Sequence, residues 1–305
     1  VAYNWAVEVA SVENTASGIV FDEAYEVSTR GSVVTITDPT QASFGYTVVA
    51  HGMNAGVDIY NPAGEKVADK LFVNHTILGG VTTNQSNPFR GNEYEGKAVL
   101  ATWGDTGYGA VVIDPLNTEA EPFTLFAGEK QTSGNFVYNG ESLGGGTAGI
   151  SFIKDEAGEP YMLSFSEDHE GTSNTIVRYH LSSPWQITEA PYQLGYASLL
   201  ANTNVDIVTY GNGIFVSQVR GSGNNAKGCP CFAYITGVLT DNDHFTAMTS
   251  ADEGIVEHVD GNTSGIAVSA DGKTFAADLT GKVVLFDLAT DEYGDPKLTY
   301  RSEFE

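Results

Sequence analysis

Cysteine and positive charge are scarce in this chain. Its 305 residues include two Cys, and 14 Lys and Arg stand against 39 Asp and Glu, which gives a formal net charge of −25. Two cysteines exclude the disulfide framework that holds small secreted domains together. Duplex nucleic acid and anionic lipid are poor partners for so negative a surface, because binding them needs clustered Lys and Arg. The composition favours an extracytoplasmic setting (periplasm, cell surface or secretion) over the cytoplasm.

Long apolar runs, helical patterns and catalytic motifs are also missing. No stretch approaches the ~20 consecutive apolar residues of a membrane helix. No window of about 11 residues keeps apolar positions at i, i+3, i+4 and i+7 beside a credible cap. The zinc-protease motif and the phosphate-binding loop are absent from the sequence. The runs 140–144 and 144–149 have the spacing of a nucleophile elbow and of a dinucleotide fingerprint, but no helical pattern follows either of them, as both motifs require. The chain therefore offers no motif that names a reaction.

What is present is a series of short runs rich in Val, Ile, Tyr, Phe and Thr, with turn residues every ~8–12 positions. Such spacing predicts an all-β fold. Several units begin with a Gly-led strand, at 17–22, 148–152 and 264–269. A second apolar strand follows, and then a third that ends in a polar residue. The predicted third strands are 32–38, 56–61, 109–114, 175–180, 231–236 and 282–287.

Four antiparallel strands recurring about every 40–60 residues are typical of propeller blades. A single sheet that is apolar on both faces cannot bury them alone, so blades stack in a ring. We expect residues 1–305 to form one β-propeller of six blades, with five or seven as alternatives. The first blade is expected to be irregular, and a strand at 4–10 to close the ring by completing the last blade. A small β-domain ending near residue 45, followed by a second domain, is the rival prediction.

The segment 265–287 has a strand, an Asp271-Gly272 turn, a strand, a short turn and a strand. It resembles bacterial β-propeller repeats of the YVTN and NHL kind. Asp-Gly supplies the positive φ of a tight hairpin. The chain is also similar to uncharacterised lipoprotein propellers of gut and marine bacteria. That resemblance implies a periplasmic or surface location, with a lipid anchor outside the printed sequence.

By analogy with other propellers, the loops joining second to third strands are expected to lie on one face and to form a ligand site. These loops are rich in Gly and carry many of the chain's His, Trp and Arg residues. Aromatic faces stack on sugars, while polar groups fix orientation. The alternative is that Gly-rich hairpin loops simply accept polar residues. The candidate ligand-binding residues are His51, Trp103, Asp105, Tyr108, Asp168, His169, Arg220 and Asp278.

Two further groups have chemical potential. The acidic cluster 167–170 suits Ca²⁺, a hard ion that takes several oxygens, or a general acid and base, or else it is a solvated loop. Cys229 and Cys231 flank Pro230. They are predicted to be two buried thiols, with a shared metal or a strained disulfide as alternatives. Ca²⁺ is the one candidate cofactor.

The leading functional hypothesis is a non-catalytic binding domain that recognises a glycan, a peptide or an envelope protein through the loop-rich face. It assigns no catalytic residue. The alternative is a propeller hydrolase or lyase that acts on a carbohydrate or lactone. That alternative expects Asp105, Asp168 and Asp278 to converge on the axis, with or without Ca²⁺. A purely structural scaffold is the third hypothesis.

Overall fold

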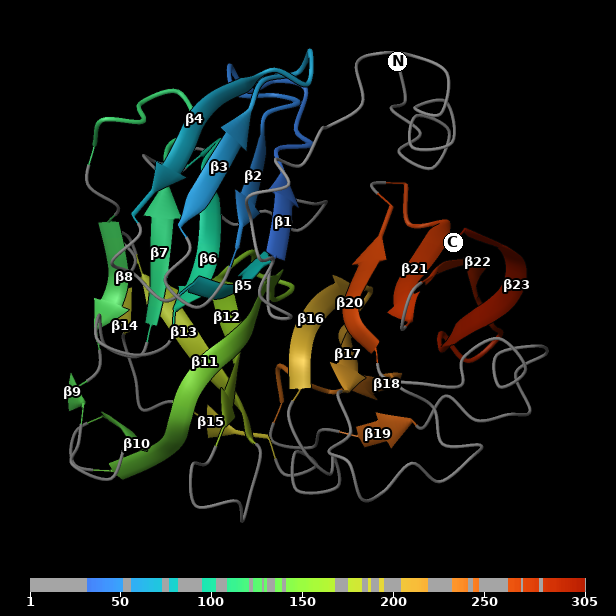
Figure 1. Cartoon of the computed structure of the whole chain (residues 1–305). Helices are drawn as coiled ribbons and strands as arrows, with labels where there is room; N and C mark the ends of the chain where they lie inside the picture. Colours follow the sequence, from blue (N-terminus) through green and yellow to red (C-terminus); the bar gives the residue numbers. More distant parts are fainter. Residues whose placement is uncertain are drawn as a thin grey trace.

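The computed structural model describes residues 32–51, 56–72, 77–81, 95–102, 109–120, 123–127, 129–130, 135–138, 141–167, 175–182, 186–187, 192–194, 204–218, 232–240, 244–246, 263–269, 271–279 and 282–304. These residues form five antiparallel β-sheets (Figure 1). No helix suited to crossing a membrane occurs in these ranges. The prediction of an all-β fold is confirmed.

We number the five sheets in chain order. The first sheet has the order β1-β2-β3-β4, with the bounds Ser32–Thr35, Thr47–Ala50, Val57–Tyr60 and Lys66–Leu71. The second has the order β5-β6-β7-β8, with the bounds Ile77–Val81, Ala98–Thr102, Gly109–Ile113 and Phe123–Ala127. Each strand pairs with the next one along the chain, so each sheet is a simple meander.

The third sheet has the order β14-β13-β12-β11-β10-β9, and β15 also pairs with β13. From β9 to β15 the bounds are Glu129–Lys130, Asn135–Tyr138, Glu141–Lys154, Pro160–Glu167, Thr175–Ser182, Gln186–Ile187 and Tyr192–Gln193. The fourth sheet, β16-β17-β18-β19, has the bounds Asn204–Tyr210, Gly213–Gln218, Phe232–Thr236 and His244–Thr246. The fifth, β20-β21-β22-β23, has the bounds Thr263–Val268, Thr274–Leu279, Lys282–Thr290 and Pro296–Phe304.

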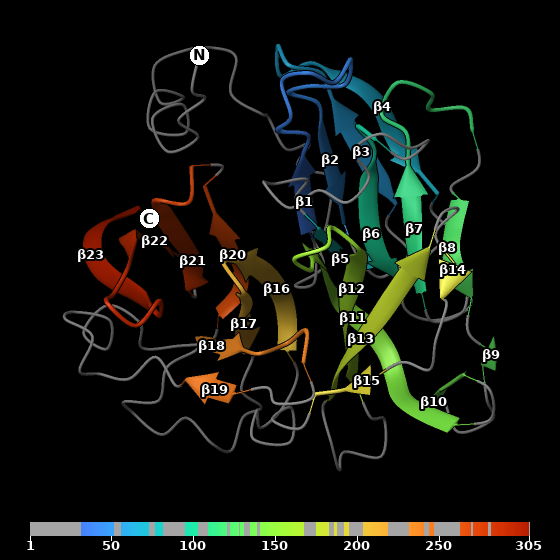
Figure 2. The same ribbon diagram turned by 180° about the vertical axis from the view of Figure 1, so that it is seen from behind.

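One strand of each sheet takes part in a continuous inner series. β1 contacts β5, β5 contacts β11, β11 contacts β16, and β16 contacts β20. Figures 1 and 2 show the sheets spreading outward from this series. Four of the five sheets are four-stranded meanders that join this series through their first strand, and the larger third sheet joins it through β11. This arrangement is a β-propeller, as predicted. The number of blades stays a prediction, since residues 1–31 lie outside the described part.

Most predicted strands match the structure, with one correction. The strands predicted from 46–50, 98–102 and 214–219 are second strands, and those from 56–61 and 282–287 are third strands. The prediction of a third strand at 32–38 is wrong: among the described residues β1 is the first strand of its sheet and pairs only with β2. The prediction relied on the polar residue at the end of this run. Asp38 belongs instead to the following turn, where its Oδ1 accepts a hydrogen bond from Thr40 N at 2.9 Å.

The core lies between neighbouring sheets. Val34, Val48 and Leu100 belong to a buried cluster of the first and second sheets. Along β16, Ile207 joins a cluster with the third sheet, whereas the next residue, Val208, joins a cluster with the fifth. Side chains alternate along a strand, so a strand between two sheets is apolar on both faces. This alternation fixes which sheet each residue of β16 meets.

Candidate functional site

The loops that the sequence predicts to form the binding face connect the second and third strands of the predicted blades. Antiparallel pairing places the two strand ends that flank each loop together, as Ala50 with Val57 and Ser166 with Thr175. The third strands β3 and β7 point the same way in Figure 1, and β13 does so in Figure 2. The flanking strand ends therefore lie at one end of the sheets, which we call the rim end. It is also the end at which the inner strands begin.

Six of the eight predicted site residues lie outside the described residues, and their roles stay predictions: Trp103, Asp105, Tyr108, Asp168, His169 and Arg220. Cys229 and Cys231 also lie outside them. Asp278 is on β21, opposite Val283 of β22 and one residue from the rim end of its strand. His51 is described and directly follows β2.

The inner strands β11, β16 and β20 share a bulge near the rim end. In each, the inner strand advances by three residues where its partner strand advances by two. Regular pairing resumes at Ile150, Ile207 and Ile266. The residue before the isoleucine is Gly in β11 and β20 but Asp206 in β16. Bulges re-aim side chains and are frequent next to active sites. Asp206 thus places a carboxylate at a position where two equivalent strands carry none.

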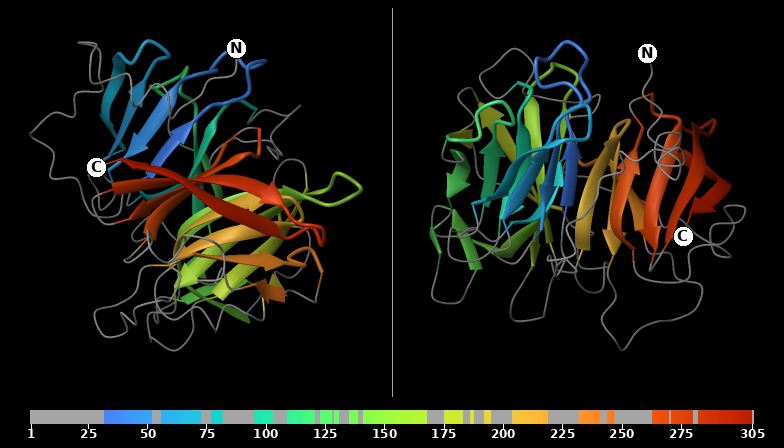
Figure 3. Two further views of the ribbon diagram at one scale, coloured as in Figure 1. Left: turned by 90° about the vertical axis from the view of Figure 1, so that its right-hand side faces the viewer. Right: turned by 45° about the horizontal axis from the view of Figure 1, so that its top comes forward.

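The Asp206 carboxylate joins two neighbouring sheets. Its Oδ1 accepts from Ile207 N at 3.0 Å, and its Oδ2 accepts from Ile266 N of β20 at 3.1 Å. β20 is the inner edge of the fifth sheet, so amides turned away from β21 have no ladder partner. Asp206 N, which the bulge removes from regular pairing, donates to Ser217 Oγ at 2.9 Å. The gold β16 and orange β20 lie side by side in Figure 3.

Burial raises the pKa of Asp206 to about 7, and it outweighs the hydrogen bonds from Ile266 and Ile207, which favour the charged form. A carboxyl group with such a pKa exchanges a proton near neutrality. That property suits a general acid or base. A pKa raised in this way, at the rim end of an inner strand, makes Asp206 the strongest functional candidate among the described residues.

A second ionisable centre lies in the first sheet. His51 and Asp58 are 3% and 1% exposed, and His51 Nε2 lies 3.1 Å from Asp58 Oδ2. Lys66 Nζ is 2.9 Å from the same oxygen, and Lys70 N donates to Asp58 Oδ1 at 2.9 Å. Lys70 has a φ of 52°, a strained value for a residue with a side chain, and its amide meets the carboxylate. His51 is therefore held inside a buried ionic cluster.

In this cluster the negative charge of the Asp58 carboxylate is stabilised by its hydrogen-bonding partners. Burial opposes ionisation of Asp58, but the Lys70 amide, Lys66 and His51 together hold the pKa of Asp58 below its usual value. The hydrogen bond to Asp58 in turn raises the pKa of Lys66. A buried carboxylate with this many partners stays charged at neutral pH. The cluster suits a structural or positioning role, whereas Asp206 suits proton transfer.

The described residues include no group of three or more His, Cys, Asp or Glu side chains placed to hold a metal ion. The prediction of Ca²⁺ rests on loops that lie outside these residues. Sequence reasoning missed both Asp206 and Asp58. A signal for Asp206 exists, because Val205-Asp206-Ile207 parallels Ala148-Gly149-Ile150 with Asp in place of Gly.

No family model matches the chain, and no curated protein matches it in sequence. The resemblance to YVTN and NHL repeats therefore stays a prediction. Among solved structures, hydrazine synthase of Kuenenia stuttgartiensis is similar at 10% identity over 88% of this chain and 80% of that chain, with a TM-score of 0.50. This likeness concerns the fold alone. The chain is a β-propeller.

Two other solved structures align with a lower TM-score. A putative 6-phosphogluconolactonase from Bacteroides fragilis is 12% identical over 92% of this chain and 85% of that chain, with a TM-score of 0.47. An exo-β-1,3-galactanase from Clostridium thermocellum is 11% identical over 90% of this chain and 62% of that chain, with a TM-score of 0.49.

Proposed function

We propose that this propeller is an enzyme, a hydrolase or lyase that acts on a carbohydrate or a lactone, with Asp206 as its acid–base residue. One observation carries the proposal: burial raises the pKa of Asp206 to about 7 at the rim end of an inner strand. The equivalent positions of β11 and β20 hold Gly149 and Gly265. A half-buried carboxyl group that departs from the repeat in this way is more readily explained by chemistry than by packing.

The chemical reason is the leaving group. Cleaving a glycoside or opening a lactone requires a proton on a departing alkoxide oxygen, and an ordinary carboxyl group has already lost its proton at neutral pH. A carboxyl group with a pKa near 7 still holds one in about half of the molecules. Glycoside hydrolysis also needs a second carboxylate about 5–10 Å from the first. Asp278, Asp105 and Asp168 are the proposed candidates for that partner.

The proposal is tested on the purified full chain with panels of chromogenic glycosides and lactones between pH 5 and pH 8. Asp206→Asn is expected to lower kcat by at least about 100-fold, the usual size of an acid–base contribution. The matched control is Asp271→Asn in the β20–β21 turn, an exposed carboxylate whose pKa is lowered by its hydrogen bond from Ser269. The control is expected to keep the wild-type rate. Equal rates in wild type and Asp206→Asn would reject Asp206 as the acid–base residue.

A non-catalytic binding domain for a glycan or envelope protein is the second candidate. The two backbone amides that donate to the Asp206 carboxylate favour this candidate over an enzyme, because the same contacts fit a purely structural link between sheets. With such a role, Asp206 would not act as an acid–base residue. In that case a glycan array or envelope extract yields a ligand, no substrate is turned over, and Asp206→Asn binds as the wild type does. For either function we propose an extracytoplasmic location.

A further inference from the structure

The bulge of β16 holds Asp206 through its backbone as well as through its carboxylate. Asp206 N donates to Ser217 Oγ of β17 at 2.9 Å, and Ser217 is fully buried. Regular pairing of β16 with β17 stops at Asn204 and resumes at Ile207, and Ser217 is the residue of β17 that lies opposite this gap. A buried hydroxyl thus accepts the amide that the bulge leaves outside the ladder.

The other sheets that carry this bulge lack both the carboxylate and the hydroxyl at these two positions. Inner strand β5 has the bulge too, since it advances by three residues from Ile77 to Gly80 where β6 advances by two. In β5, β11 and β20 the position equivalent to Asp206 is glycine. Opposite the bulge the fourth sheet has Ser217, whereas these three sheets have Ala101, Phe165 and Asp278. Two departures from the repeat that meet in one bulge indicate residues that act together.

The direction of the Asp206 side chain depends on this bulge. Ile207 packs toward the third sheet, whereas Val208 packs toward the fifth. Asp206 shares the direction of Val208, and its Oδ2 accepts from Ile266 N of β20 at 3.1 Å. A bulged residue is not held by the ladder, so its side chain can be re-aimed. The anchor at Ser217 therefore determines whether the carboxylate stays directed at β20.

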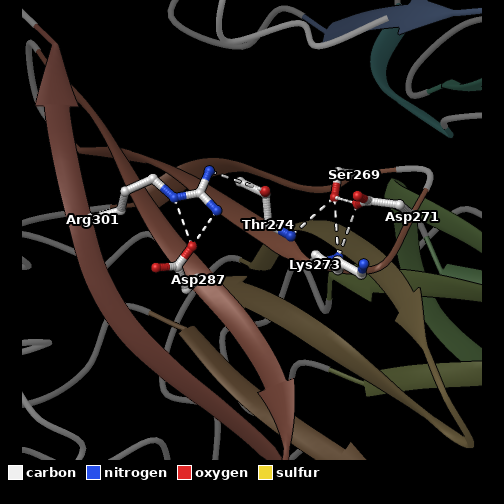
Figure 4. A network of polar contacts seen from close by, with 6 residues as sticks. All are labelled: Ser269, Asp271, Lys273, Thr274, Asp287 and Arg301. Atoms are coloured by element: carbon white, nitrogen blue, oxygen red, sulfur yellow. Dashed lines mark hydrogen bonds and ion pairs between the residues drawn. The ribbon is translucent and has the colours of Figure 1, made fainter. Parts of the chain in front are cut away.

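A second serine shows a different way in which a hydroxyl acts on a carboxylate. In the turn that joins β20 to β21, Ser269 Oγ donates to Asp271 Oδ1 at 2.6 Å and accepts from Thr274 N at 2.9 Å (Figure 4). That direct bond is the largest cause of the lowered pKa of Asp271. Ser217 instead accepts the backbone amide of Asp206, so it acts on the carboxylate by fixing the position of the residue.

We propose that Ser217 is a positioning residue for Asp206. Its hydroxyl fixes the Asp206 backbone within the bulge, and this directs the carboxylate onto the Ile266 amide of the next sheet. As a role in catalysis the inference rests on the proposed function, but the geometry that it describes can be measured without a substrate. If Asp206→Asn keeps the wild-type rate, the proposed function fails, while the link between Ser217 and Asp206 is tested separately.

Carboxyl ¹³C NMR titration of the full chain, labelled at aspartate, tests the proposal, and the Asp206 signal is the one that Asp206→Asn removes. In Ser217→Ala the carboxylate is expected to lose its bond to Ile266 N. Burial raises the pKa of Asp206 and two amide hydrogen bonds lower it, with no charged group of the described residues among the causes. The pKa of Asp206 is therefore expected to rise from about 7 by at least about one unit, a tenfold higher proton affinity. The Ile266 amide is expected to exchange at least about tenfold faster.

Ser151→Ala is the matched control. Ser151 is also a buried serine beside β16, and its Oγ lies 2.6 Å from Thr209 Oγ1 on the side of the third sheet. Its loss is expected to leave the pKa of Asp206 and the exchange of Ile266 unchanged. In assays with a substrate, Ser217→Ala is expected to move the pH profile upward by the same one unit and to lower kcat by at least about tenfold, with KM little changed. Ser151→Ala is expected to keep the wild-type pH profile.

Three results would overturn the proposal. The first is an unchanged pKa of Asp206 in Ser217→Ala. The second is a fall of this pKa toward its ordinary value, because it would show that Ser217 keeps water from the carboxylate rather than directing it at Ile266. The third is an equal shift in Ser217→Ala and Ser151→Ala, which would assign the effect to a general loosening of β16. The amide of Phe215 reports whether the fourth sheet stays folded, and if Ser217→Ala exposes it, Ser217→Cys replaces that variant with the same expectation, because sulfur is a weak acceptor.

Discussion

The Asp206 carboxylate of β16 accepts the amide of Ile266, a residue 60 positions further along the chain and on the next sheet, at 3.1 Å. The same carboxylate accepts the amide of Ile207, which occupies the equivalent position in its own sheet. One side chain therefore satisfies two repeat-equivalent edge amides. Where it sits, burial raises its pKa to about 7, so this link between sheets is sensitive to pH.

The pH dependence of stability follows from the sign of that shift. An unfolded Asp has a pKa near 3.9, so the folded state binds the proton more tightly than the unfolded state. The stabilisation is complete below about pH 4 and is lost as the pH rises through about 7. Between pH 5 and pH 8 the unfolding free energy of wild type is expected to fall relative to Asp206→Asn by about 2 kcal/mol. Urea denaturation at both pH values measures this difference, and a constant difference would contradict it.

Asp58 is expected to behave in the opposite way. Asp58→Asn leaves Lys66 without its buried counter-charge and His51 without its carboxylate partner, so it should destabilise the fold by about 3 kcal/mol at pH 7. Because the pKa of Asp58 is lowered, its stabilisation is present above about pH 4 and is lost as the pH falls below its folded value. The gap between variant and wild type should therefore narrow in acid.

The control for Asp58 is Asp69→Asn. Asp69 also contacts Lys66, at 3.0 Å, but it is 56% exposed. Exposed ion pairs contribute less than about 1 kcal/mol, so thermal denaturation should place this variant close to wild type. Equal losses in the two variants would show that the burial of Asp58 is not what matters.

Arg178 holds the third and fourth sheets together through its geometry as well as its charge. Its Nη1 donates to Val238 O at 3.0 Å and to Thr240 O at 3.2 Å, and its guanidinium lies 4.7 Å from the Tyr192 ring. Arg178→Lys keeps the charge but loses the planar fork, and is expected to cost about 1–2 kcal/mol. Arg301→Lys, at an exposed pair with Asp287, should cost less than about 1 kcal/mol. Chemical denaturation of both variants gives the comparison.

Gly213 is predicted to reject any side chain. A Cβ there would lie 2.3 Å from Ile235 O and 2.7 Å from the Tyr234 ring, so Gly213→Ala is expected to destabilise the fold by about 3 kcal/mol. Gly158→Ala is the comparison, because a Cβ at that position meets open space and bears only the strain of φ +86°. That strain is about 1 kcal/mol. Melting temperatures of the two variants should rank in this order, and the reverse ranking would refute the contact.

Local patterns predicted most of the second and third strands but not every first strand. The Gly-Ile pair that reveals β11 and β20 is Asp206-Ile207 in β16, so the glycine signal that identifies inner strands is lost where the candidate functional residue stands. The sequence pattern predicts a third strand at 32–38, whereas β1 is a first strand. A polar residue after an apolar run indicates a turn, but it does not indicate which strand of the sheet precedes that turn. The burial of Asp58 was not predicted either, since alternation in Val57-Asp58-Ile59 gives the face but not what covers it.

The sequence by itself determined that the chain is all-β and that its strands pair with their neighbours. Hairpins are local, and their turn residues and alternating side chains are written in consecutive positions. Only the tertiary structure decided that Asp206 meets Ile266 and that His51 is closed inside a cluster with Asp58 and Lys66. Such contacts depend on how separate sheets stack and on which side chains this stacking shields from water. That is a property of the assembled ring, and no single strand encodes it.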